Sequence, residues 1–155
     1  MGVKLFRIDD RLIHGQVISG WARVTAATRV LILDDVVAKD ELSLALFKMA
    51  SPPGVSVEAV TVEDGIKLLK EELKDNTIVL FRTPKEAKQV YDAGVSMPKL
   101  NVGGCGSKPG RTNFYRNVHL TPDEVEILRE MAKDGVVIEL QMVPDGSQQN
   151  INNIK

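Results

Sequence analysis

Short apolar runs rich in β-branched residues alternate with amphipathic segments along the chain. The run Val30–Leu33 is apolar at every position, which is typical of a strand covered by helices on both faces. Alternation of this kind predicts an α/β fold, an open sheet with helices on both faces. The expected strands are Val3–Ile8, Arg29–Asp35, Val55–Val60, Thr77–Phe81, Lys99–Val102, Asn117–Leu120, which is weak, and Val136–Val143.

Three of the segments between these runs begin alike. Thr61, Thr83 and Thr121 each stand three residues before an acidic residue. A threonine in this position can cap free backbone N–H groups, so each is expected to begin a helix. Gly94 and Gly135 follow two of these helical patterns and predict their ends.

Composition limits the class of protein. The 155 residues suit one domain, 1–155, and 43% apolar and 26% charged residues are ordinary for a globular chain. Twenty basic and 21 acidic residues leave a net charge of −1, which argues against binding nucleic acid or a membrane surface through bulk charge. The single cysteine, Cys105, permits no internal disulfide. The N-terminal residues lack an apolar signal core, so we expect a cytoplasmic protein. The polar tail 145–155 is expected to be loosely held.

In open α/β sheets, sites form in the loops at the carboxyl ends of the strands. This rule selects Asp9–Gly15, the stretch after Asp34, and the glycine-rich Gly103–Gly110. The third of these lacks the spacing of a nucleotide-binding phosphate loop. Its glycines are expected to allow tight turning or a close approach to the first loop.

One of only two histidines, His14, stands between the first strand and a helical pattern. Free N–H groups at a helix start favour an anion there and keep the imidazole neutral. Arg11, three residues earlier, can reach the same anion with a planar fork of donors. These groups suit a residue that accepts and releases phosphoryl, with Asp10 and the backbone of Ile13, Gly15 and Gln16 completing the anion cradle. A structural histidine, or an anion site without chemistry, is the alternative.

Two adjacent acids precede this histidine. Asp9 and Asp10 can cap the backbone or pair with Arg7 or Arg11, and one of them can orient the ring of His14. We favour a structural role for Asp9 and leave the role of Asp10 open.

The stretch Arg7–Val17, followed by Trp21, resembles the signature of the IIB subunit of the mannose/fructose/sorbose class of the bacterial sugar phosphotransferase system. The resemblance covers essentially the whole chain, except that Cys105–Ser107 replace the Met and bulky apolar residue common in the family. Further matches in the family's order and spacing are Ile32–Asp35, Pro52–Val55, Ala93–Val95, Asn101–Gly104 and the start at Thr121 leading into Gly135–Pro144.

The resemblance implies a mainly parallel seven-stranded sheet and a transient phosphohistidine at His14, with Nδ1 as the acceptor nitrogen. It places the family's active-site arginine on Arg11. The phosphoryl group would arrive from the phosphohistidine of a IIA domain, itself charged by HPr, without metal or nucleotide. It would leave to a hexose-type sugar bound by the IIC and IID membrane subunits, with which the protein would associate peripherally. The identity of the sugar and the oligomeric state are left open.

Other polar residues have simpler expected roles. Asp34 and Asp35 are expected to cap the following helix, and His119 to be structural. Arg82 can face an incoming phosphohistidine, but a solvated or Asp-paired arginine is preferred. No cluster has the spacing of metal ligands, so no metal is expected.

Charge alone predicts an exposed basic rim at the same place. Arg7 and Arg11, with Arg82 or Lys108, would form it and steer an acidic face of the IIA domain.

Overall fold

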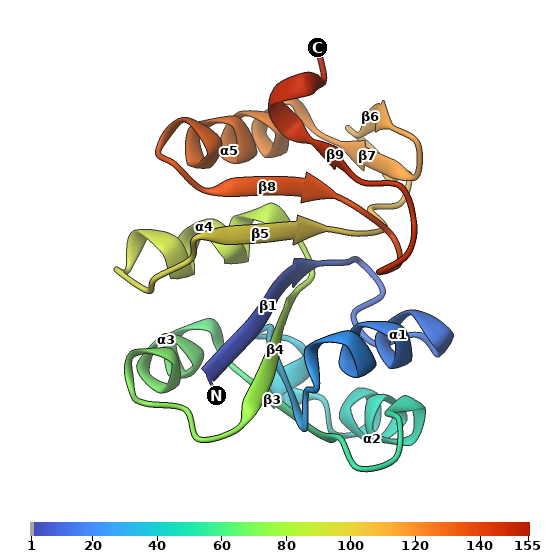
Figure 1. The fold of residues 1–155 in the computed structure, drawn as a ribbon, viewed down its shortest axis with the longest axis vertical. Helices are drawn as coiled ribbons and strands as arrows, with labels where there is room; N and C mark the ends of the chain where they lie inside the picture. The colour runs from blue at the N-terminus through green and yellow to red at the C-terminus, as the bar shows by residue number, and fades with distance from the viewer. Residues whose placement is uncertain (1) are drawn as a thin grey trace.

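The computed structural model describes residues 2–155 and has a mixed seven-stranded sheet at its centre (Figure 1). The sheet strands are β1 (Gly2–Ile8), β2 (Arg29–Leu33), β3 (Ser56–Val60), β4 (Asn76–Phe81), β5 (Lys99–Val102), β8 (Val137–Leu140) and β9 (Gln149–Asn150). Their order is β3-β2-β4-β1-β5-β8-β9, and all pairs are parallel except β8 with β9. The predicted α/β fold is confirmed.

Helices cover both faces of this sheet. They are α1 (Gly15–Thr25), α2 (Glu41–Ala50), α3 (Val62–Lys70), α4 (Pro84–Asp92) and α5 (Pro122–Lys133), with short 3-10 turns η1 (Val37–Lys39) and η2 (Ile151–Asn153). Successive residues of a strand face opposite sides. Val30 and Ile32 therefore pack in a core with α1, whereas Leu31 and Leu33 pack in a second core with α3, α4 and α5. All four side chains are fully buried, as their apolar run predicted.

One of the seven predicted strands, the weak sixth, lies outside this sheet. Asn117–Leu120 becomes β7 (Val118–Leu120), which pairs with β6 (Thr112–Tyr115) in a separate hairpin. The seventh place belongs to β9, in the tail expected to be loose. That expectation is wrong because Ile151 is fully buried and Arg129 donates hydrogen bonds to the carbonyl groups of Ile151 and Ile154.

The threonine caps are confirmed at two of three positions. The hydroxyl oxygens of Thr61 and Thr121 accept from the backbone N–H three residues later. Helix α4 begins directly after Thr83, as predicted, but Thr83 donates to the carboxylate of Glu86 at 2.6 Å and caps no backbone group, so only its predicted capping contact is wrong. Gly94 and Gly135 follow α4 and α5 with positive φ, as stop signals should.

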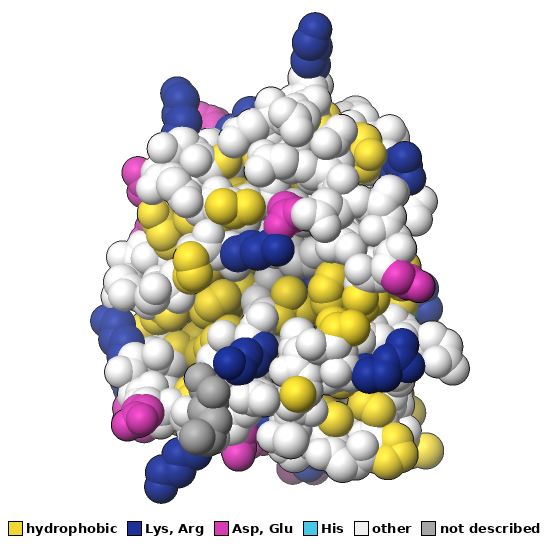
Figure 2. All heavy atoms as spheres, viewed as in Figure 1, with side chains coloured by type: hydrophobic (Ala, Val, Ile, Leu, Met, Phe, Trp, Pro, Cys, Tyr) yellow, Lys and Arg dark blue, Asp and Glu magenta, His cyan; other side chains and the backbone are white. Residues whose placement is uncertain are grey.

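Helix α2 has an apolar outer surface. Asp40 caps its N-terminus, and Leu44 and Phe47 hold it against the core. Leu42 and Met49 point outward and are 72% and 82% exposed. Figure 2 shows hydrophobic side chains at the lower right of the molecule, where Figure 1 draws α2.

Candidate functional site

Two of the predicted loops meet at the carboxyl edge of the sheet. Because β1 and β5 are parallel neighbours, the loops that follow them, 9–14 and 103–110, emerge side by side. The backbone N–H of Asp10 donates to the carbonyl of Gly104 at 2.9 Å. An open pocket of about 500 Å³ lies between the loops, with room for a phosphoryl group. Its lining includes Asp9, Asp10, Arg11, His14, Gly104, Cys105 and Gly106.

Packing of the first loop brings His14 to this pocket. Leu12 and Ile13 are buried in the core beneath α1, and Leu12 adopts a left-handed backbone conformation with φ +56°. His14 is then the N-cap residue of α1, and no side chain caps the helix. Gly15 follows with φ +46°, a conformation that favours glycine. The histidine ring therefore stands at a helix start whose free N–H groups favour an anion.

Asp9 orients the imidazole of His14. The Nε2 atom of His14 lies 3.0 Å from Oδ2 of Asp9, which is fully buried, whereas the histidine side chain is 14% exposed. A carboxylate accepts, so Nε2 carries the proton and Nδ1 keeps a free lone pair. Asp9 has both of the roles considered from the sequence, because its Oδ1 also accepts from the backbone N–H of Arg11.

Behind Asp9 lies a buried arginine. Arg7 donates to Oδ2 of Asp9 at 3.1 Å, to the carbonyl of Met142 at 3.0 Å and to the side chain of Asn101. Its guanidinium lies 5.2 Å from the ring centroid of Trp21. Burial lowers the pKa of Arg7, and the charge of Asp9 opposes that shift. Arg7 is 1% exposed, so its predicted place in an exposed basic rim is wrong.

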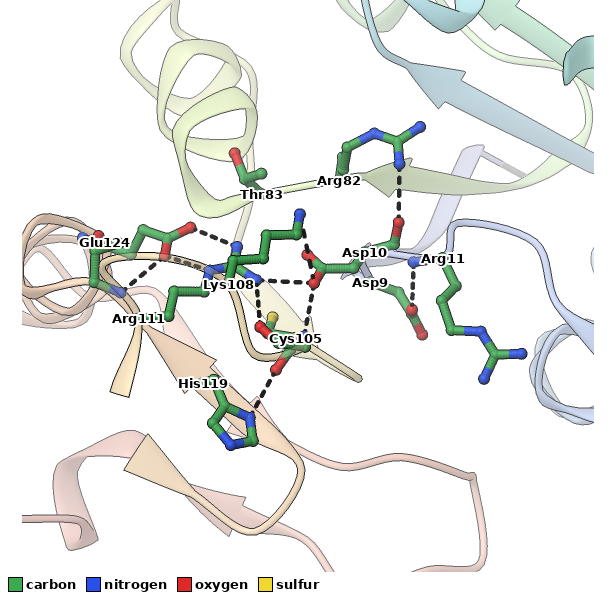
Figure 3. A network of polar contacts seen from close by, with 12 residues as sticks. Asp9, Asp10, Arg11, Arg82, Thr83, Cys105, Lys108, Arg111, His119 and Glu124 are labelled. Carbon is green, nitrogen blue, oxygen red and sulfur yellow. Dashed lines mark hydrogen bonds and ion pairs between the residues drawn. The ribbon is translucent and has the colours of Figure 1, made fainter. Parts of the chain in front are cut away.

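Asp10 points to the second loop rather than to His14. Its Oδ2 accepts from the backbone N–H of Gly106 at 2.6 Å and from Arg111 at 2.8 Å (Figure 3). Its carbonyl accepts from Arg82 at 3.0 Å. The glycine-rich loop makes the close approach expected of it, and Asp10 ties it to the loop of His14. The sequence analysis did not single out Arg111. Its position directly after the glycine-rich loop was the one signal that could have indicated its role.

Arg11 and the start of α1 are the remaining predicted phosphate contacts. Figure 3 shows the Arg11 side chain extending away from the contacts around Asp10, and no acceptor within residues 2–155 holds its guanidinium. Gln16 is exposed, whereas the side chain of Ile13 is buried, so only the backbone of Ile13 is available to a ligand. These roles stay predictions.

The roles preferred from the sequence for Arg82, Asp34 and His119 are confirmed. Arg82 pairs with Asp34 at 3.1 Å, and Asp34 caps the turn that follows it through the N–H of Val37. His119 lies in the β6–β7 hairpin, with Nδ1 3.3 Å from the carbonyl of Cys105.

One capping prediction at this edge is wrong. Asp35 does not cap the helix that follows it, because its carboxylate accepts from the N–H of Val62 at the start of α3. Asp35 therefore contacts α3, which follows β3, rather than η1 or α2, which directly follow Asp35 in the chain.

Across residues 2–155, no three His, Cys, Asp or Glu side chains gather as a metal site would require. No helix in that range combines the length and apolarity needed to cross a membrane.

Comparison with known proteins identifies the family. The family model described as PTS system sorbose subfamily IIB component matches residues 3–155. The sorbose-specific EIIB component of Klebsiella pneumoniae is 36% identical over 153 residues, 97% of this chain and 93% of that protein. The mannose-specific EIIAB component of Escherichia coli K12 is 30% identical over 92% of this chain and 45% of its own length.

A solved structure agrees. The crystal structure of the IIBSor domain of the sorbose permease from Klebsiella pneumoniae superimposes with a TM-score of 0.92 at 35% identity, covering 97% of this chain and 94% of that chain. The resemblance drawn from the sequence is confirmed, and the chain belongs to the sorbose subfamily of IIB components of the sugar phosphotransferase system.

Proposed function

We propose that this IIB component accepts a phosphoryl group on Nδ1 of His14 and passes it to a sugar. The observation that carries the proposal is the contact between Nε2 of His14 and buried Asp9, which leaves Nδ1 as the nucleophilic nitrogen at the pocket. Membership of a phosphotransferase family supports it.

The donor in this proposal is the phosphohistidine of a IIA domain. The lone pair of Nδ1 forms a bond to phosphorus as the donor's N–P bond breaks and its electron pair returns to the donor ring. The proton on Nε2 of His14 stays beside Asp9 throughout. A relative named EIIAB supports a IIA partner. In the second transfer, a sugar hydroxyl oxygen attacks phosphorus, the Nδ1–P bond breaks with its electron pair returning to the ring of His14, and the hydroxyl proton passes to water.

The rest of the pocket would stabilise the transferring group. Phosphoryl transfer depends on positioning and on neutralising charge on the equatorial oxygens. The guanidinium of Arg11, which no acceptor within residues 2–155 holds, and the N–H groups at the start of α1 would supply that charge. Neither metal nor nucleotide is needed, because the donor phosphohistidine is already activated.

Labelling tests the first transfer. The protein is incubated with labelled phosphoenolpyruvate, the first-stage kinase, HPr and the matching IIA. We expect an acid-labile, base-stable phosphate that is lost in His14→Ala. His119→Ala is the matched control, since it removes the only other histidine, and it should label normally. Normal labelling of His14→Ala, or phosphate binding without a covalent adduct, would contradict the proposal.

The second transfer needs membranes that contain the IIC and IID subunits. Labelled wild-type protein should lose its phosphate when these membranes and the transported hexose-type sugar are added together, with the label recovered as sugar phosphate. Release of free phosphate alone would contradict a role in sugar phosphorylation. Association with the IIC and IID subunits at the membrane face is part of the same proposal.

A further inference from the structure

The two loops that form the pocket are joined by one nearly buried arginine. We propose that Arg111 is a positioning residue, which holds the loop segment Gly104–Gly106 against the loop of His14 and so sets the shape of the phosphoryl pocket. The proposal rests on the proposed function of His14. It concerns a residue outside the signature stretch that carries the histidine.

The guanidinium of Arg111 reaches both loops. Its Nη1 donates to Oδ2 of Asp10 at 2.8 Å and to the carbonyl of Gly106 at 3.0 Å. Oδ2 of Asp10 also accepts from the N–H of Gly106, so the three groups close a ring of contacts. The Arg111 side chain is 4% exposed, which leaves it little access to a ligand. Its role is therefore to hold the pocket rather than to touch the phosphoryl group.

The other side of Arg111 is fixed to the scaffold. Its Nε and Nη2 donate to the two carboxylate oxygens of Glu124 at 2.9 and 2.8 Å, a bidentate pair (Figure 3). Glu124 lies in the first turn of α5 and also accepts from the N–H of Thr121, completing a capping box. Burial acts to raise the pKa of Glu124, but hydrogen bonds from Arg111 and Thr121 outweigh it and lower that pKa. Glu124 therefore anchors Arg111 to the start of α5, which the capping box holds in place.

Asp10 depends on this arginine. Its Oδ1 is buried and has no hydrogen-bond partner within residues 2–155, and Nζ of Lys108 is 3.8 Å from its Oδ2. Without Arg111, a largely buried carboxylate would keep one close contact, to the N–H of Gly106. A buried carboxylate with so few partners lowers the stability of the folded protein unless it moves toward water. Asp10 adjoins Asp9, which orients His14, so movement of Asp10 would disturb both loops.

The expected consequence is kinetic. A misplacement of about 1 Å in a reacting geometry costs about 100-fold in rate. Displacing the Gly104–Gly106 wall of the pocket by less than about 1 Å should therefore slow phosphoryl transfer, measured at saturating donor, by about 10-fold or more. The donor concentration at half-saturation should change less than twofold, because Arg111 is too buried to form the docking surface.

Three variants separate positioning from stability. Arg111→Gln removes the charge and the fork. Glu124→Gln keeps an oxygen that can accept from Thr121 but weakens the anchor, and should slow transfer less. Thr121→Ala is the matched control, since it breaks the capping box without removing a contact of Arg111. It should lower Tm but leave the transfer rate unchanged. Equal slowing by Thr121→Ala, in proportion to its loss of Tm, would overturn the proposal.

Amide hydrogen exchange at Gly106 provides a readout that needs no phosphoryl transfer. Exchange there should accelerate at least about 10-fold in Arg111→Gln and remain at the wild-type rate in Thr121→Ala. If Arg111→Gln fails to fold, Arg111→Lys, which keeps the charge but not the fork, gives the same comparison. If the wild-type protein is not phosphorylated in the labelling assay, the proposed function is refuted. If the wild-type protein is phosphorylated but the Arg111 variants transfer phosphoryl and exchange the Gly106 amide at wild-type rates, only this inference is refuted.

Discussion

Asp9 links the chemistry of the pocket to the interior of the protein. One oxygen of its carboxylate accepts from His14 and Arg7, and the other accepts from the backbone N–H of Arg11. The negative charge is fully buried, and Arg7 neutralises it. The identity of this residue therefore determines which ring nitrogen of His14 carries the proton.

Asp9→Asn is expected to abolish most of the phosphorylation of His14. An amide group can donate to Nε2 and stabilise the opposite tautomer, which puts the proton on Nδ1. By analogy with the loss caused by the wrong tautomer in a catalytic triad, we expect labelling to slow by at least about 100-fold. Initial labelling rates and ¹⁵N chemical shifts of the ring test this together. Asp35→Asn, which alters an acid that makes no contact with His14, should label normally; a wild-type tautomer in Asp9→Asn would contradict the assignment.

Residue-level predictions from sequence succeeded where the chemistry is local. The helix start after His14 followed from a short-range pattern, whereas the partner of Arg82, Asp34, lies 48 residues away and could not be named from the sequence. The burial of Arg7 did not follow from the sequence either, because it depends on Trp21 and on carbonyl groups near residue 142, which lie in other elements. The choice between Asp9 and Asp10 likewise depends on how each side chain points once the loop is folded.

At the scale of elements, the loop after β5 fits against β1 only because it begins with glycine. A Cβ atom at Gly103 would lie 2.1 Å from the guanidinium of Arg7, which is surrounded by its own hydrogen bonds. At Gly104 the nearest atom would be the flexible end of Met142, at 3.4 Å. Neither glycine has a positive φ, so packing alone distinguishes the two positions.

Gly103→Ala is expected to lower the free energy of unfolding by about 3 kcal/mol, through overpacking and displacement of a buried charge. Gly104→Ala should lower it by less than about 1 kcal/mol. Urea unfolding measures both. Equal effects in the two variants would show that Arg7 can move at little cost.

The last strand and turn should contribute strongly to stability. Ile151 is fully buried against the core that α5 covers, so Ile151→Ala is expected to cost about 2–4 kcal/mol. Asn153→Ala, at an exposed position of the same turn, should cost less than about 0.5 kcal/mol. A small effect at Ile151, measured by thermal unfolding, would mean that the tail is loosely held after all.

The tail also shows why one strand of the sheet was missed in the sequence. Thr77–Phe81 is recognisable because four of its five residues are apolar and consecutive, whereas β9 consists of Gln149 and Asn150 and has no such pattern. It becomes a strand because β8 offers a free edge and Ile151 anchors the chain beside it. Pairing of this kind depends on tertiary contacts that a local pattern does not encode.

At the scale of the whole molecule, burial of one thiol predicts a dependence of stability on pH. Burial raises the pKa of Cys105 from 9.0 to about 12, and the charge of Asp10 adds to the shift. Above pH 9 the unfolded thiol ionises while the folded thiol stays protonated. Stability is therefore full below pH 9 and falls as the pH rises toward 12.

From this residue alone, the free energy of unfolding should be about 1 kcal/mol lower at pH 10 than at pH 8. Cys105→Ala should lose that part of the dependence while keeping the contributions of other groups. Urea unfolding of both proteins at the two pH values measures the difference. Identical slopes against pH would contradict the assigned burial.

The direction of β1 constrains how a donor domain can be joined to this one. The chain enters the sheet at Gly2, at the end of β1 away from the pocket (Figure 1). Seven residues of strand span about 23 Å, so a domain fused ahead of Gly2 would start about that far from the end of β1, where the loop of His14 begins. A flexible tether has a root-mean-square length of about 23 Å at roughly 17 residues. Fusions with much shorter tethers should therefore transfer phosphoryl between molecules rather than within one.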